Sequence, residues 1–172
     1  MTQKENKLQL FFRTLLDAYG PQHWWPGETP FEVMVGAVLT QNTNWANVER
    51  AINNLKKAKL LDPEKLHALD PGRLAELIRP AGYFQVKTKR LKNFLAWLMT
   101  ACDGDISQLQ SWSVHQLREE LLSVNGIGRE TADSIILYSL NKPTFVVDTY
   151  TYRILVRHGL LDADSDYDAI KD

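Results

Sequence analysis

Apolar side chains recur every three or four residues along most of the chain, which is the spacing of helices with one buried face. One such run comprises Phe31, Met34, Val35, Val38 and Leu39. No segment alternates apolar and polar residues over the length of a strand, and no tight Asn-Gly or Asp-Gly turn joins two segments of that kind. The pattern therefore predicts an all-α fold.

Capping residues mark where several of these helices begin. Thr29 precedes Pro30, and Glu32 follows at the spacing of a capping box. Similar start signals are Asp62-Pro63, Asp70-Pro71 and the pair Ser113 and Gln116. We expect helices near residues 5–18, 30–41, 44–58, 63–68, 71–79, 85–101, 113–123, 129–140 and 149–158.

The composition fits one folded domain or two small lobes. The 172 residues are 44% hydrophobic and 24% charged, which is enough to bury a core and excludes global disorder. No apolar run approaches the roughly 18 residues of a membrane span, and the polar start Met1–Leu8 does not resemble a secretory signal. The single cysteine, Cys102, forms no internal disulfide and cannot hold an iron–sulfur cluster alone, so we expect an inert thiol in a reducing compartment.

The net charge of −1 hides an uneven distribution of charge along the chain. Five acidic residues and one basic residue lie after Leu161, and the rest of the chain has 19 basic against 16 acidic residues. The body is therefore mildly basic, which permits a phosphate-binding face without demonstrating one.

The segment Leu121–Ala132, with the sequence LLSVNGIGRETA, carries the clearest functional pattern. One helix ends, a Gly-x-Gly turn follows, and a second helix starts. Gly126 and Gly128 permit close approach of another backbone, and the amides that begin the second helix suit a phosphate. The alternative interpretation is a tight helix–helix connection that binds nothing.

Further along, the apolar run Phe145–Val147 leads to Asp148 at the start of another helix. Asp148 is either a simple N-cap or a carboxylate that stabilises a sugar cation or activates water beside a DNA-binding hairpin. The position alone does not choose between these roles.

Taken together, these segments resemble the helix-hairpin-helix DNA glycosylase superfamily, in its endonuclease III group. The matching stretches are LLSVNGIGRETAD from Leu121, VVDTYTYRI from Val146, AVLTQNT from Ala37 and GYFQVKTKRL from Gly82. The resemblance covers about Phe31–Leu160 and implies a two-lobe helical fold with a DNA cleft between the lobes. One lobe would be 27–141, with the hairpin at 113–140; the other would join 1–26 to 142–172 and is expected to be truncated at its C-terminus.

The resemblance also implies roles for individual residues. Asp148 would be the catalytic aspartate. The DNA-contacting residues of the hairpin would be Gly126, Gly128 and Arg129. The backbone carbonyls of Leu122, Val124 and Ile127 would bind a monovalent cation, K⁺ or Na⁺, that bridges to a DNA phosphate.

The chain departs from the group at Glu130. Bifunctional members carry a lysine nucleophile at this position, two residues after the second hairpin glycine. A carboxylate forms no Schiff base with the sugar, so we expect the β-lyase step to be lost.

Three tryptophans resemble the base-pocket aromatics of the 3-methyladenine glycosylase subgroup, which also carries Trp-Trp-Pro and a glutamate at the lyase position. They are Trp24, Trp25 and Trp45, and Asn42 is expected to border the same pocket. Electron-rich rings stack favourably on a cationic alkylated purine. The alternative for the adjacent pair is one core and one surface tryptophan.

The remaining candidates lie in two loops and a basic run. The resemblance implies that Gln41 fills the space left by a flipped base and that Tyr83 is the wedge that replaces lost stacking. Gln41 is otherwise a capping or surface amide, and Tyr83 a buried loop aromatic. Lys87 belongs to a run with Lys89, Arg90 and Lys92, which is either a solvated face or a phosphate contact.

The sequence thus predicts a monofunctional DNA N-glycosylase that flips and hydrolytically releases an alkylated purine such as 3-methyladenine. Its partner would be damaged double-stranded DNA and not a membrane. We expect a cytoplasmic monomer, associated with the nucleoid in a bacterium or archaeon, that requires no cofactor and holds no iron–sulfur cluster. Two alternatives remain open: an endonuclease III-like glycosylase and lyase for oxidised pyrimidines or abasic sites, and a non-catalytic DNA-binding hairpin module.

Overall fold

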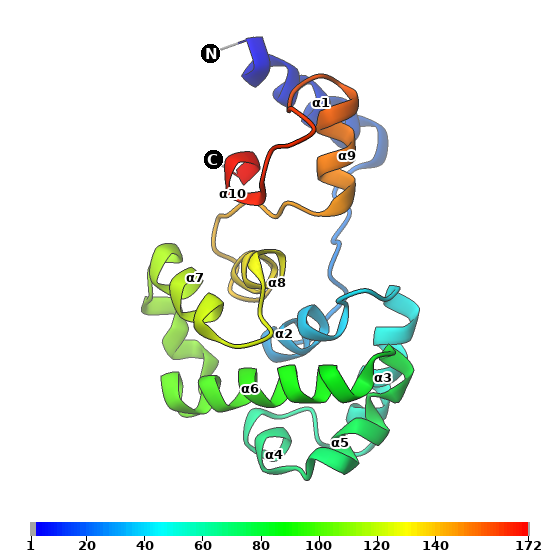
Figure 1. Ribbon diagram of the computed structural model, residues 1–172, viewed down its shortest axis with the longest axis vertical. Coiled ribbons are helices and arrows are strands. Elements are labelled where there is room, and N and C mark those ends of the chain that lie inside the picture. The colour runs from blue at the N-terminus through cyan, green and yellow to red at the C-terminus, as the bar shows by residue number, and fades with distance from the viewer. Residues whose placement is uncertain (1–2, 172) are drawn as a thin grey trace. The chain divides into compact units, whose positions relative to one another are not determined.

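The structure is a computed structural model that describes residues 3–171 as helices joined by turns and short extended segments (Figure 1). The helices are α1 (Gln3–Tyr19), α2 (Pro30–Leu39), α3 (Trp45–Lys57), α4 (Pro63–Ala68), α5 (Pro71–Leu77), α6 (Phe84–Cys102), α7 (Val114–Ser123), α8 (Arg129–Ser134), α9 (Thr149–Arg157) and α10 (Tyr167–Lys171). Short 3₁₀ turns, η1 and η2, occupy Arg79–Ala81 and Ile106–Ser111, and a π-helical turn, η3 (Ile135–Ser139), continues α8. Residues 3–171 contain no strand, which confirms the all-α prediction.

The chain is divided into two compact units. The larger unit is Gly27–Val146, and the smaller unit joins the segment before Gly27 to the segment after Val146. The larger unit was predicted to end at Asn141, but it extends to Val146. The residues between these two positions belong to it because hydrogen bonds tie this part of the chain to the larger unit. Lys142 Nζ donates to the Gln110 carbonyl at 2.9 Å, and Gln110 Nε2 donates to the Leu140 carbonyl at 3.1 Å.

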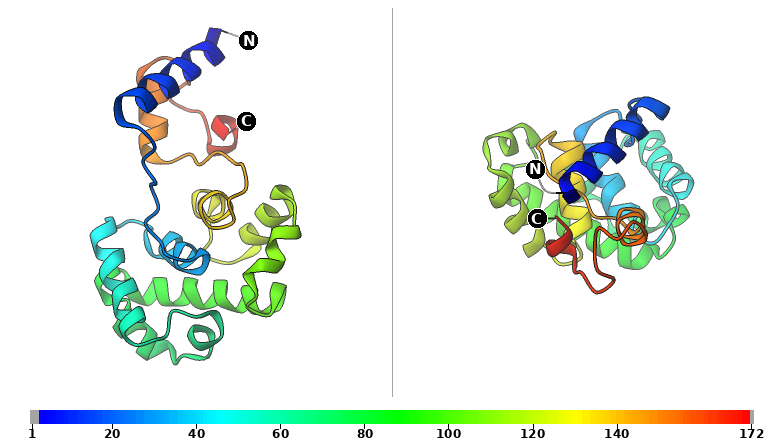
Figure 2. Two further views of the ribbon diagram at one scale, coloured as in Figure 1. Left: turned by 180° about the vertical axis from the view of Figure 1, so that it is seen from behind. Right: turned by 90° about the horizontal axis from the view of Figure 1, so that it is seen from above.

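Helix α6 is the central helix of the larger unit. Figures 1 and 2 show α4 and α5 along one side of it and α2 along the other, and each of these helices contacts α6. Leu91, Phe94, Leu95 and Leu98 of α6 are fully buried. Burial of each such side chain stabilises the fold by about 1.5–3 kcal/mol.

Helix α2 is buried from Phe31 to Leu39 because its sequence is apolar apart from Glu32. Thr29 caps it as predicted, since its hydroxyl accepts from the Glu32 amide at 3.2 Å. The Glu32 carboxylate does not complete the predicted capping box, in which it would accept from the Thr29 amide. It accepts instead from the Glu28 amide at 3.2 Å and pairs with Lys56 at 2.8 Å, and this hydrogen bond raises the pKa of Lys56.

The smaller unit contains α1, α9 and α10. The rings of Phe11 in α1 and His158 after α9 meet edge to face with centroids 4.7 Å apart. The apolar face of α1 is largely exposed, and Phe12, Leu15 and Tyr19 line a hollow of about 430 Å³. In the described part of the chain, no helix combines the length and apolar character needed to cross a bilayer.

Candidate nucleic-acid interface

The Gly-x-Gly segment forms a tight turn between α7 and α8, both in the larger unit. Gly126 has φ of +101°, which L-residues rarely adopt, whereas Gly128 has φ of −95° and is the N-cap of α8. No side chain caps this helix start, and Arg129 and Glu130 are exposed in its first turn. The turn therefore presents backbone and the N-terminus of a helix at the surface, the arrangement that suits an anion.

The two glycines are expected to respond differently to alanine. A Cβ at Gly126 would lie 3.0 Å from Cβ of Arg90 and closer still to its Cγ, and a non-glycine residue at this φ costs about 1–3 kcal/mol. A Cβ at Gly128 would meet nothing within 4 Å. We expect both variants to bind damaged and undamaged duplexes more weakly, but only Gly126→Ala to melt at lower temperature.

Fluorescence anisotropy with both duplexes, together with thermal melting, checks this expectation. Phosphate contacts carry no sequence information, so each variant should lose affinity for the two duplexes equally. Unchanged affinity in Gly128→Ala would contradict a role of the turn in binding DNA.

Helix α6 holds the hairpin turn through two half-buried residues about one helical turn apart, Arg90 and Asn93. Arg90 Nη1 donates to Gln41 Oε1, and Asn93 Nδ2 donates to the Asn125 carbonyl at 2.9 Å. Gln41 Nε2 in turn donates to the Gly126 carbonyl at 3.2 Å and to the Thr131 hydroxyl at 3.1 Å. The structure thus brings the predicted residues Gln41 and Gly126 into direct contact.

The basic run on α6 does not form a single surface, because the helix points its members in different directions. Lys89 is exposed, whereas Lys87 is only 1% exposed. Lys87 Nζ donates to the Leu39 carbonyl at 2.9 Å and to the Ala81 carbonyl at 2.7 Å. Burial, and secondarily the charge of Arg90, lower the pKa of Lys87. The expected phosphate contact of Lys87 is therefore wrong, since its ammonium is committed inside the larger unit.

The other predicted loop residues reach the surface. Asn42 and Tyr83 both have left-handed backbone conformations, with φ of +54° and +44°, and both are exposed. Tyr83 is 75% exposed, so the alternative of a buried loop aromatic is wrong. An exposed aromatic ring on a tight turn is available to contact a partner.

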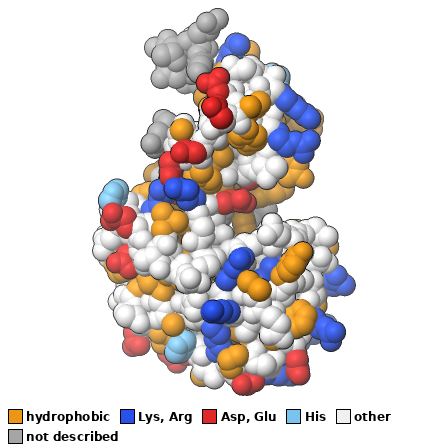
Figure 3. Space-filling view, viewed as in Figure 1, with side chains coloured by type: hydrophobic (Ala, Val, Ile, Leu, Met, Phe, Trp, Pro, Cys, Tyr) orange, Lys and Arg blue, Asp and Glu red, His pale blue; other side chains and the backbone are white. Residues whose placement is uncertain are grey.

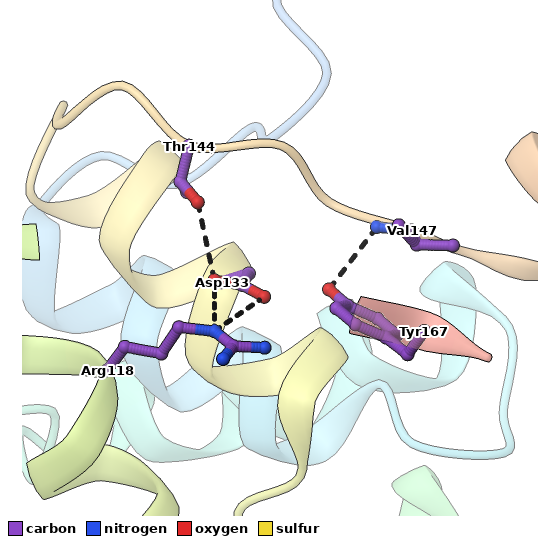
Figure 4. Close-up of polar contacts among 5 residues, drawn as sticks. All are labelled: Arg118, Asp133, Thr144, Val147 and Tyr167. Carbon is purple, nitrogen blue, oxygen red and sulfur yellow. Dashed lines mark hydrogen bonds and ion pairs between the residues drawn. The ribbon is translucent and has the colours of Figure 1, made fainter. Parts of the chain in front are cut away.

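A buried carboxylate joins the two hairpin helices to the segment that follows them (Figure 4). Asp133 in α8 is fully buried and accepts from Arg118 Nε of α7 at 3.2 and 3.3 Å and from the Thr144 hydroxyl at 3.3 Å. Removing one partner of a buried pair costs about 3–5 kcal/mol, so this triad fixes the hairpin geometry. This triad was not predicted, although an aspartate between Ala132 and the apolar run 135–137 is a signal for a buried partner.

Asp148 lies in the smaller unit as the N-cap of α9. Its carboxylate accepts from the Thr151 amide at 2.7 Å and is partly exposed. The residue before it is also anchored, because the Val147 amide donates to the Tyr167 hydroxyl of α10 at 3.3 Å (Figure 4). Asp148 is therefore an N-cap, and its second carboxylate oxygen is not needed for capping.

The predicted pocket aromatics come from both units. Trp24 and Trp25 lie in the smaller unit on the extended segment after α1, and Trp24 is 72% exposed. Trp45 is the first residue of α3 in the larger unit and is half-buried. On the face that Figure 3 shows, Lys and Arg side chains are interspersed with acidic and apolar ones, so charge alone does not mark a binding site on that face. Within residues 3–171, no group of three His, Cys, Asp or Glu residues gathers to hold a metal ion.

Comparison with known sequences identifies a protein family. Residues 35–172 match the HhH-GPD superfamily of base excision DNA repair proteins. A Methanocaldococcus jannaschii protein named "Putative DNA repair glycosylase MJ1434" is 49% identical over 174 residues, covering 98% of this chain and 79% of that protein. Endonuclease III of Thermotoga maritima is 32% identical over 130 residues, covering 76% of this chain and 57% of that enzyme.

Solved structures share the fold. H. pylori 3-methyladenine DNA glycosylase (MagIII), bound to 1,N6-ethenoadenine, has a TM-score of 0.81 and 33% identity, covering 99% of this chain and 79% of that one. A non-covalent Endonuclease III–DNA complex has a TM-score of 0.82 at 21% identity, covering 99% of this chain and 76% of that one. The second likeness concerns the fold alone.

Proposed function

The chain belongs to the HhH-GPD superfamily of base excision DNA repair proteins and is a DNA N-glycosylase, and from this premise we propose that it releases alkylated purines by hydrolysis, without a lyase step. The observation that carries the proposal is Glu130, exposed in the first turn of α8 where a lyase would need an amine. A carboxylate forms no Schiff base with an abasic sugar.

Lys87 does not substitute for the missing amine. Its ammonium is buried between two backbone carbonyls, so it has no path to a sugar at the surface. With a carboxylate at 130, water would be the nucleophile, as in a monofunctional enzyme.

The choice of base follows from the aromatic residues. Trp24, Trp25 and Trp45, bordered by Asn42, would form the pocket that stacks on the flipped base. A cationic alkylpurine gains about 0.5–2 kcal/mol of cation–π attraction from each well-placed aromatic ring, in addition to the stacking that a neutral pyrimidine also gains. The likeness to a 3-methyladenine DNA glycosylase structure supports the same substrate class.

Each predicted residue then has a task. The hairpin turn, with Gly126, Gly128 and Arg129, would hold the phosphate backbone, while Tyr83 enters the duplex as the damaged base leaves it. Gln41 would enter with it once its amide leaves the Gly126 carbonyl and the Thr131 hydroxyl. The carboxylate of Asp148 would stabilise the positive charge that develops on the sugar, or position the attacking water. A cationic 3-methylpurine is already a good leaving group and needs little help from a general acid.

A monovalent cation fits the donor set of the turn. The Val124 carbonyl accepts from the Ile127 amide at 3.0 Å and keeps a second lone pair. With the carbonyls of Leu122 and Ile127, it would offer neutral oxygen ligands to K⁺ or Na⁺. The bound ion would add positive charge beside a DNA phosphate.

The test is release of free base from two substrates, methylated DNA and a duplex with an oxidised pyrimidine. We expect free 3-methyladenine from the first, little product from the second, and strand breaks only after alkali. Efficient release from the oxidised duplex with a borohydride-trapped covalent complex would instead establish a lyase. Binding of both duplexes without any release would establish a non-catalytic module.

A further inference from the structure

The buried ammonium of Lys87 joins the ends of two helical segments. Leu39 is the last residue of α2 and Ala81 is the last residue of η1, and Lys87 Nζ donates to both of their carbonyls. Carbonyls at a helix C-terminus lack intrahelical partners, so this single ammonium provides a hydrogen-bond donor to the ends of two helical segments.

Each of these carbonyls lies just before one of the two loops proposed to enter DNA. Gln41 comes two residues after Leu39, and Tyr83 comes two residues after Ala81. Both loops then turn through left-handed residues, at Asn42 and at Gly82 and Tyr83. The ammonium therefore stands at the common base of the two loops.

We propose that Lys87 is a positioning residue that sets the separation between the Gln41 loop and the Tyr83 loop, so that both enter one duplex at the same site. This inference rests on the proposed function. A side chain that replaces a flipped base and one that wedges into the opposite strand act together only at a fixed distance. Because the ammonium contacts both loop bases at hydrogen-bond distance, its loss removes the direct link between them, while Gln41 keeps its separate contacts with the hairpin.

A neighbouring lysine on the same helix provides a matched control. Lys92 Nζ donates to the carbonyls of Leu66, at 3.2 Å, and His67, at 2.6 Å, and also to that of Leu69. These residues lie at and just after the end of α4, away from the proposed DNA loops in the sequence. Lys92 is half-buried whereas Lys87 is buried, but each variant, Lys87→Met or Lys92→Met, removes an ammonium of α6 that donates to backbone carbonyls near a helix end.

The experiment measures base unstacking separately from bond cleavage. A 2-aminopurine placed beside the damaged base reports unstacking by its fluorescence, in single-turnover mixing with wild type, Lys87→Met and Lys92→Met. We expect the unstacking rate of Lys87→Met to fall roughly tenfold or more, with excision falling in parallel. Lys92→Met should keep the wild-type rate of unstacking, and thermal melting of both variants shows how much stability each one loses. The affinity for an undamaged duplex should stay unchanged in both variants.

Unstacking in Lys87→Met equal to that in Lys92→Met would overturn the inference. If the wild type unstacks the damaged base but releases no free base, the proposed function fails. The comparison of 2-aminopurine fluorescence between Lys87→Met and Lys92→Met still decides the role of Lys87. If Lys87→Met does not fold, Lys87→Gln, which keeps an N–H donor, is compared with Lys92→Gln by the same criterion. In a Gln41→Ala and Tyr83→Ala background, Lys87→Met should cause no further loss of unstacking, since it acts through those two residues.

Discussion

Replacing Asp148 by asparagine is expected to lower the rate of base excision on the order of 10²-fold or more, because the group proposed to stabilise the developing sugar cation loses its charge. Asparagine caps a helix about as well as aspartate, so its amide oxygen can still accept from the Thr151 amide. Affinity for lesion-containing DNA should therefore remain close to that of the wild type. Single-turnover excision and equilibrium binding measure the two quantities separately.

Asp62→Asn is the matched control for this variant. Asp62 caps α4 through the same contact, accepting from the Lys65 amide at 3.0 Å. The two variants should show similar small changes in melting temperature, while only Asp148→Asn loses excision. A loss of melting temperature in Asp148→Asn without loss of the intrinsic rate would reduce Asp148 to a structural cap.

The predicted helix starts depended on local contacts, and for that reason they could be predicted from the sequence. Asp62, Asp70 and Ser113 each accept from an amide three residues later, at 3.0 to 3.1 Å. Such contacts form within one turn and need no partner from elsewhere in the chain. Asp166 makes the same contact with the Ala169 amide at 2.8 Å just before α10, a helix that was not predicted because the acid-rich segment after Leu161 was considered only for its charge.

The end of the second hairpin helix differed from prediction for a tertiary reason. The expected single helix 129–140 changes at Ile135 into the π-helical turn η3, where the Leu140 amide donates to the Ile135 carbonyl at 3.2 Å. The hydroxyl of Ser139 in this turn donates to the carbonyl of Pro30, the first residue of α2, at 2.8 Å. A contact over such a separation leaves no periodic signal in the local sequence.

The same limit applies to the interface. Gly126 could be predicted because its backbone conformation restricts the residue type. The side-chain partners of Gln41 could not, since Arg90, Gly126 and Thr131 are all distant in sequence. The basic run on α6 illustrates the consequence: four charges close in sequence predict a charged face, yet the packing of α2 and η1 around Lys87 buries one of them.

The aromatic residues proposed for the base pocket should lose excision of alkylpurines when replaced by alanine. Stacking of a base on an aromatic side chain contributes about 1–3 kcal/mol, so each of Trp24→Ala, Trp25→Ala and Trp45→Ala should slow excision roughly 5- to 150-fold. Trp24 is 72% exposed, so its replacement should leave the melting temperature almost unchanged. Release of 3-methyladenine from methylated DNA under single-turnover conditions gives the rates.

Trp97 is the control that separates stacking on substrate from packing. It is half-buried on α6, its ring lies 5.7 Å from that of Phe94, and its Nε1 donates to Glu120 at 3.2 Å. Trp97→Ala should therefore lower the melting temperature. At assay temperatures below its melting temperature, the variant should excise the base at the wild-type rate. Because a cation gains more than a neutral base from an electron-rich ring, the pocket variants should also lose their preference for the cationic alkylpurine over a neutral base. Equal losses for both classes of base would contradict the proposed preference of these tryptophans for a cationic base.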